Sequence, residues 1–178
     1  MTASKTGSAH GTSAASKPRK SAAGTQDEGV LAVLTKDHRD VKKLFSAYQR
    51  LVDTDAPASQ RRISAEQICA MLTAHASVEE ELFYPAVRDA AGDATQTMDE
   101  AQVEHASLKA LIAQLQSMEP NEALYDAKVK VLGEYVDHHV KEEEGEIFPA
   151  ARKAGIDLQR LGVQVAARKE ELLGTSVH

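Results

Sequence analysis

The sequence predicts an all-α protein: an up-down-up-down four-helix bundle with a short C-terminal fifth helix and a disordered N-terminal tail. The chain of 178 residues is 42% hydrophobic but only 4% aromatic, a composition that favours helices over β-sandwiches and barrels. Apolar residues recur at spacings of three and four in successive segments, as they do on one face of a helix. Short breaks separate these segments, and short connections are typical of antiparallel neighbours in a bundle.

The tail comprises residues 1–26, which carry four basic residues and no acidic one. Apart from Met1, its apolar residues are all alanines. Such a segment cannot bury enough surface to offset its ordering entropy, so we expect it to be disordered, with a weak polyanion-binding arm as the other interpretation. It lacks the apolar region of a secretory signal. The rest divides into a bundle over 27–155 and a C-terminal helix and tail over 156–178.

The first two helices precede Gly92. The first is expected to span about 25 residues, and its stripe is Leu31, Leu34, His38, Val41, Phe45, Tyr48 and Val52. Pro57 suits the first turn of the second helix. The stripe of that helix, which ends near Pro85 and Gly92, is Ile68, Leu72, His75, Glu79 and Leu82.

The third and fourth helices repeat this arrangement. The third stripe, which Pro120 ends, is Met98, Ala101, His105, Leu108, Ile112 and Leu115. The fourth, which ends near Pro149 and Gly155, is Leu132, Tyr135 or Val136, His139, Glu143 and Ile147. Asp157 is a candidate cap for a shorter fifth helix, which Gly162 weakens.

Four histidines lie in the middle of the four stripes, one on each helix: His38, His75, His105 and His139. All four should therefore point into the bundle at a similar depth. A single histidine on an apolar face is usually a satisfied core residue. Four buried imidazoles without partners would be costly, whereas a shared metal site would use all of them.

Two of these histidines are followed by a glutamate at the fourth position, in the pairs His75-x-x-x-Glu79 and His139-x-x-x-Glu143. Residues four apart lie on one helix face, so both side chains of a pair can reach one metal ion. Pro85 and Pro149 follow the two histidines at the same interval. This internal repeat indicates two helical hairpins that each supply two histidines and one glutamate.

The pattern His…His-x-x-x-Glu…His…His-x-x-x-Glu, with Glu-Glu and an aromatic–Pro after each pair, resembles hemerythrin-like (HHE cation-binding) domains over about residues 30–155. The resemblance implies a non-haem di-iron centre, with two Fe ions joined by an oxo or hydroxo bridge. It implies that the four histidines are terminal ligands and that Glu79 and Glu143 bridge the irons. Imidazole and carboxylate ligands independently suit iron or manganese, and the lone Cys69 excludes a multi-thiolate site.

The sequence departs from oxygen-carrying hemerythrins, which have a fifth histidine four residues before the one on the third helix. Ala101 occupies that position here. One iron is therefore expected to hold a water or another residue. Tyr135 is a candidate because it lies one turn before His139, and a core aromatic is the alternative interpretation.

Neighbouring residues leave further alternatives. His138 also has a glutamate, Glu142, four residues later, but the stripe favours His139. Glu144 is the other choice for the bridge, although a regular helix turns it about 140° away from His139 unless Gly145 permits a distortion. Glu80 and Glu81 are expected to be solvated or to orient ligands.

We expect a non-haem di-iron protein that binds or senses oxygen, or handles peroxide or nitric oxide. The alternatives are a catalase- or peroxidase-like di-iron enzyme, an iron storage or buffering protein, and a structural zinc site. No second catalytic constellation accompanies the metal residues, which favours binding or sensing. No apolar run approaches the roughly 20 residues of a membrane span. The net charge of −6 argues against nucleic-acid binding by the whole chain, and a lone cysteine suits a reducing cytoplasm.

Overall fold

The computed structural model describes residues 29–91 and 95–175, which contain helices and no strand. The expected tail, the break at Gly92 and two of the histidines, His10 and His178, lie outside these ranges. The helices, in order, are α1 (Val30–Asp53), α2 (Ala58–Val78), α3 (Tyr84–Ala90), α4 (Thr95–Gln116), α5 (Tyr125–Glu142), α6 (Phe148–Lys153) and α7 (Leu158–Thr175). Two π-helical turns, η1 (Glu79–Phe83) and η3 (Glu143–Ile147), join α2 to α3 and α5 to α6.

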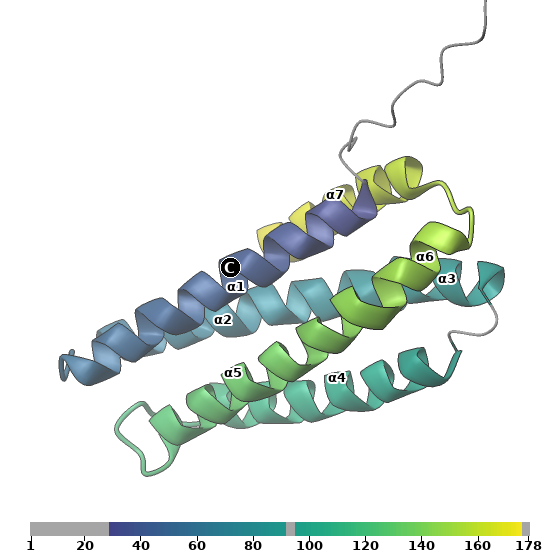
Figure 1. The fold of residues 1–178 in the computed structure, drawn as a ribbon. Helices are drawn as coiled ribbons and strands as arrows, with labels where there is room; N and C mark the ends of the chain where they lie inside the picture. The colour runs from purple at the N-terminus through teal and green to yellow at the C-terminus, as the bar shows by residue number, and fades with distance from the viewer. Residues whose placement is uncertain (1–28, 92–94, 176–178) are drawn as a thin grey trace, which may run out of the picture.

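The predicted four-helix bundle is confirmed. Helix α1 packs on α2 and α4 packs on α5, and the contacts of α1 with α5 and of α2 with α4 close the bundle. Figure 1 shows the two hairpins side by side, with the connections at alternating ends. Each histidine of the sequence pattern therefore comes from a different long helix.

The second and fourth predicted helices continue past Pro85 and Pro149 and end two residues before Gly92 and Gly155, the glycines near which the sequence also places their ends. Helix α3 extends beyond Pro85 to Ala90, and α6 extends beyond Pro149 to Lys153. A proline lacks the N–H for the helical hydrogen bond and clashes with the carbonyl four residues earlier. In both helices that carbonyl lies in a π-helical turn, whose wider backbone accommodates the ring.

Two apolar clusters fill the bundle, one at each end. The cluster around the π turns and α7 includes Leu34, Val78, Phe83, Ala101, Ile147 and Phe148. The cluster toward the opposite end includes Val41, Ile68, Leu72, Leu108, Leu132 and Val136. Each of the four stripe histidines falls, along its helix, between residues of the two clusters. A polar layer thus separates the two halves of the core.

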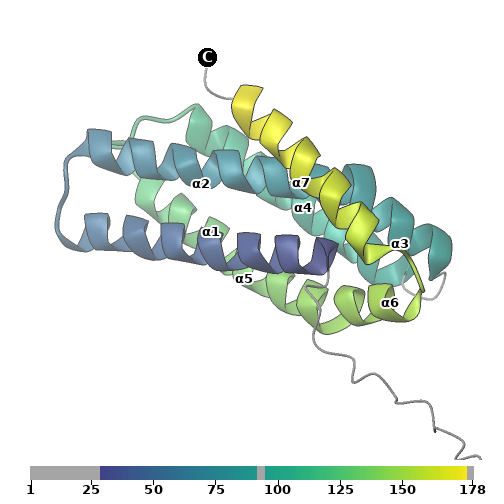
Figure 2. The ribbon, with the colours of Figure 1, turned by 90° about the horizontal axis from the view of Figure 1, so that it is seen from above.

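Helix α7 covers α1, α2 and η1 from outside the bundle (Figure 2). It has 18 residues, fewer than α1 or α4, in agreement with the shorter fifth helix that the sequence predicts. Gly162, expected to weaken it, instead permits close packing: a Cβ there would lie 2.6 Å from the backbone nitrogen of Val30. Gly29 has a φ of +57° and faces Leu158 at the same junction.

Candidate metal centre

The structure brings all six predicted ligand residues together in the polar layer. Their exposed fractions are between 0% and 7%: His38 1%, His75 7%, Glu79 0%, His105 1%, His139 3% and Glu143 1%. Ionisable side chains are rarely buried this deeply without partners. Six of them in one layer therefore need a common explanation.

Glu79 lies between the two pairs of histidines. Its Oε1 is 2.9 Å from His75 Nε2, and its Oε2 is 3.3 Å from His105 Nε2. Two groups of ligand atoms result, each with its atoms within 4.8 Å of one another: His38, His75, Glu79 and Glu143 form one, and Glu79, His105 and His139 form the other. Glu79 belongs to both groups, so its carboxylate lies within reach of both clusters.

Glu143 lies with the first group. Its Oε2 is 3.1 Å from Nε2 of His38 on the adjacent helix α1. The sequence pairs Glu143 with His139 on one ion because they are four residues apart. In the structure the glutamate reaches the histidines of the other hairpin, which links the two hairpins through the site.

Each of the four histidines contacts a carboxylate through its Nδ1 atom. The contacts are His38 with Glu144 at 2.7 Å, His75 with Asp37 at 3.4 Å, His105 with Glu80 at 2.9 Å and His139 with Glu104 at 2.8 Å. A carboxylate that accepts the Nδ1 proton fixes the tautomer and leaves Nε2 free for a metal ion, as in most metal-binding histidines. All four Nε2 atoms face the groups defined above.

These carboxylates form a closed circle around the bundle. Asp37 of α1 holds the histidine of α2, and Glu80 of η1 holds the histidine of α4. Glu104 of α4 holds the histidine of α5, and Glu144 of η3 holds the histidine of α1. Each carboxylate is the sequence neighbour of an inward-facing ligand on its own helix. The sequence predicts such an orienting role for Glu80 but not for Asp37 or Glu104.

Lysines contact two of these carboxylates from outside. Lys109 Nζ is 2.6 Å from Oε2 of Glu80, and Lys169 of α7 pairs with Asp37. Asp37 is 2% exposed, so the lysine compensates a charge that water cannot reach. Helix α7 is thereby connected to the centre through Asp37 and His75. Glu81, by contrast, pairs with Arg168 of α7.

Several buried polar atoms of the centre make no well-aligned hydrogen bond among the described residues, although Nε2 of His75 and of His38 lie 2.9 and 3.1 Å from a carboxylate oxygen. They are Nε2 of His38 and of His75, both carboxylate oxygens of Glu79 and of Glu143, and the hydroxyl of Tyr84. An unsatisfied buried polar group costs about 1–3 kcal/mol. Metal coordination would satisfy the imidazole nitrogens and the carboxylates at once, so these residues fit a metal site.

The pKa values of the buried acids and histidines show how strongly these groups interact. Burial raises the pKa of the Glu143 carboxyl, and the neighbouring charge of Glu79 raises it further. Burial opposes ionisation of Glu79 as well, but the adjacent His75 and His105 lower its pKa well below the ordinary value. Burial disfavours protonation of His75, yet Glu79 and Asp37 raise its pKa to about 10. The buried acids and imidazoles thus perturb one another, and a cation bound among them would relieve the repulsion between Glu79 and Glu143.

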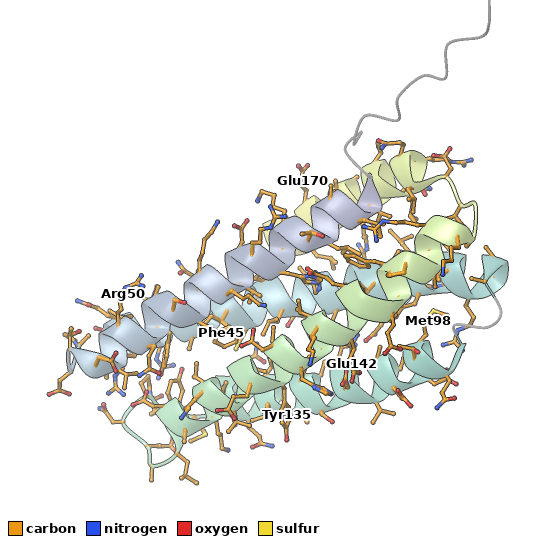
Figure 3. The ribbon with its side chains drawn as sticks, in the orientation of Figure 1. Phe45, Arg50, Met98, Tyr135, Glu142 and Glu170 are labelled. Atoms are coloured by element: carbon orange, nitrogen blue, oxygen red, sulfur yellow. The ribbon has the colours of Figure 1, made fainter. Side chains whose placement is uncertain are left out.

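Two tyrosines near the centre have contrasting surroundings. Tyr135 is 48% exposed and lies on the side of α5 toward α4 (Figure 3), so it is neither a ligand nor a core aromatic. Tyr84 is 3% exposed and stacks on the His105 ring, with 5.6 Å between centroids. Burial, together with Glu79, raises the pKa of Tyr84 well above its ordinary value, so the hydroxyl is protonated. Tyr84 belongs to the aromatic–Pro motif, but the sequence alone indicates no role for it.

A small cavity adjoins the four histidines. Its volume is about 20 Å³, slightly more than the roughly 10–15 Å³ that one water molecule needs. Besides the histidines and Asp37, apolar side chains line it: Val41, Met71, Leu72, Ala76, Leu108, Val136 and Val140. The cavity is therefore matched to a very small guest.

Comparison with known proteins identifies the family. The sequence profile of the hemerythrin HHE cation binding domain matches residues 29–151. The chain belongs to this family. HHE domains bind cations, and the clusters described above are its candidate metal ligands. None of the described helices is long and apolar enough to cross a membrane.

Individual relatives support this assignment. A crystal structure of an HHE cation-binding domain-containing protein from Mycobacterium kansasii has a TM-score of 0.67 and 25% identity, covering 82% of this chain and 87% of that one. An uncharacterized protein from Mycobacterium tuberculosis is 26% identical over 82% of this chain and 88% of its own length. A DNA nickase from Nostoc is 34% identical over 71% of this chain. This HHE chain covers only 34% of the nickase, so the similarity concerns one part of that protein.

Proposed function

We propose that this HHE domain holds two iron ions and binds a small ligand such as oxygen, nitric oxide or peroxide beside them. One ion would be held by His38, His75 and Glu143, the other by His105 and His139, and Glu79 would bridge them. The observation that carries the proposal is the position of Glu79 between two histidine pairs. Imidazole–carboxylate ligand sets suit iron and manganese, and no cysteine belongs to the described clusters.

When bound, two ferrous ions supply reversible electron transfer to a small ligand. The chain's own contribution is to select that ligand. The cavity of about 20 Å³ is close to the size of one water molecule, so it would favour the smallest ligands, and its apolar lining disfavours additional water. The four Nδ1 contacts hold the imidazoles in place while a ligand enters.

The cavity favours binding or sensing over dedicated catalysis. Asp37 is the carboxylate that lines it, and this group already contacts His75 and Lys169. It is therefore unsuited to move protons for turnover.

Tyr84 supports a second candidate function, a catalase- or peroxidase-like enzyme, because a buried neutral hydroxyl without a partner among the described residues can donate a hydrogen bond to a peroxide oxygen. Peroxide turnover by the iron-loaded protein separates the candidates. Turnover well above that of free iron favours the enzyme, and turnover near that of free iron favours binding.

Ala76→Val tests the ligand-binding proposal. Ala76 lines the cavity and is absent from the ligand clusters, so the added methyl groups fill the space without removing a ligand. We expect unchanged iron content and a nitric oxide affinity lower by about tenfold or more, the effect of small changes in apolar pockets. Iron analysis and anaerobic titration followed by absorption measure both quantities. Unchanged affinity for nitric oxide would show that the ligand binds elsewhere.

A further inference from the structure

A second group of metal-ligating side chains lies at the surface between α4 and α5. His138 Nε2 is 3.2 Å from Oε1 of Glu142 and 3.4 Å from Oε1 of Glu104. The three ligand atoms all lie within 4.8 Å of one another. Figure 3 shows Glu142 on α5 where that helix runs alongside α4. The assumed ligands of the buried centre do not include any of these three residues.

This surface group is accessible to solvent. The His138 side chain is 64% exposed, and those of Glu104 and Glu142 are 24% and 35% exposed. A groove of about 420 Å³ adjoins it, lined by Val103, Glu104, Ser107, Tyr135 and His138. The buried centre, by contrast, has no ligand side chain more than 8% exposed. A hydrated ion can therefore reach the surface group without any movement of the bundle.

Glu104 contacts both the buried centre and the surface group. Its Oε2 contacts His139 Nδ1 at 2.8 Å, and its Oε1 faces His138. One carboxylate thus touches a predicted ligand of the buried centre and belongs to the exposed group. A rotation of this side chain toward His138 would break its contact with the His139 ring.

We propose that Glu104, His138 and Glu142 form a divalent-cation site that captures a metal ion before it enters the buried centre. One imidazole and two carboxylates suit first-row divalent ions such as Fe²⁺, Mn²⁺ and Co²⁺, and leave positions for water. A partly hydrated ion bound by one exposed and two partly exposed side chains exchanges readily, as a loading site requires. The loading role rests on the proposed function of the buried centre, whereas the existence of the surface site does not.

Cobalt titration of the iron-loaded protein tests the site. We expect one additional Co²⁺ per chain in the unaltered protein. His138→Ala should weaken its affinity by at least about tenfold, the scale on which losing a contact at a metal site acts, and His138→Ala with Glu142→Gln should abolish it. Glu134→Gln, an exposed change on the same helix, is the control and should leave it unchanged. Equal cobalt affinity in the unaltered and double-variant proteins would overturn the site.

Iron uptake by the metal-free protein tests the loading role. We expect His138→Ala to slow Fe²⁺ uptake severalfold while the final iron content equals that of the unaltered protein. Equal uptake rates would overturn the capture role even if cobalt binding is lost. Iron content in each sample reports on the buried centre separately, so a failure of the proposed di-iron function would appear as missing iron in the unaltered protein.

Discussion

The four inward histidines are predictable from the sequence because residues three and four apart share a helix face. Their orienting carboxylates are harder to predict. A residue next to an inward histidine points about 100° to one side, toward a neighbouring helix whose identity depends on the bundle topology. Asp37 and Glu104 therefore look like surface acids in the sequence, although they contact His75 and His139 in the structure.

Glu144 shows how local geometry decides between adjacent residues. The sequence leaves Glu143 and Glu144 as alternatives for the bridge. A distortion at Gly145, which the sequence left open, exists as the π turn η3, yet it places Glu143 in the buried layer and Glu144 against Nδ1 of His38. Both acids thus contact the same imidazole from opposite sides.

Cys69 is expected to be a packing residue whose thiol reacts slowly. It is 3% exposed, and burial raises its pKa from the ordinary 9.0 to about 11. At pH 8 its thiolate population should be about a hundredfold below that of an unperturbed cysteine. Alkylation by iodoacetamide should therefore be slow in the folded protein and fast in denaturant. Rapid alkylation of the folded protein at pH 8 would instead indicate a reactive redox thiol.

At the scale of the helices, the repeated His–Glu–Pro interval corresponds to a π turn in each hairpin. In both hairpins the π turn begins at the glutamate and ends two residues before the proline. Single π turns inside α-helices are frequent at functional sites. Periodicity alone could not reveal them, because a widened turn leaves the apolar pattern on either side nearly unchanged.

Helix α7 lies beyond the residues that match the HHE profile, yet it is joined to the centre. Lys169 pairs with Asp37, and Arg168 pairs with Glu81 of η1. The sequence indicated a fifth helix but no role for it, because its stripe contains no candidate ligand. Its contribution to the site is indirect, through the carboxylate that orients His75.

Docking of α7 should be unusually sensitive to one glycine. Replacing a helix glycine with alanine ordinarily stabilises by about 0.5–1 kcal/mol. At Gly162 the new Cβ would collide with the backbone of Gly29 and Val30, so Gly162→Ala should destabilise by about 1–3 kcal/mol. Denaturant unfolding of the metal-free protein measures the change. Gly174→Ala, which meets nothing within 4 Å on the same helix, is the control, and equal stability of the two variants would contradict this packing.

At the scale of the whole molecule, the bundle consists of two apolar clusters with a charged layer between them. The layer contains two fully buried carboxylates beside four imidazoles. Such a layer opposes folding unless its charges are compensated, and ions bound to the folded state alone would stabilise it by mass action. The same layer that defines the site is thus the part of the core that depends most on a metal.

Metal analysis combined with absorption spectroscopy tests the di-iron centre most directly. Protein produced in iron-rich medium should contain two irons per chain, one for each histidine pair, and show near-ultraviolet bands of an oxo- and carboxylate-bridged centre. His105→Ala should lose iron and unfold at lower temperature, because bound metal contributes to folding free energy. Protein that contains only zinc or no metal, or a His105→Ala variant with unchanged iron content, would contradict the account.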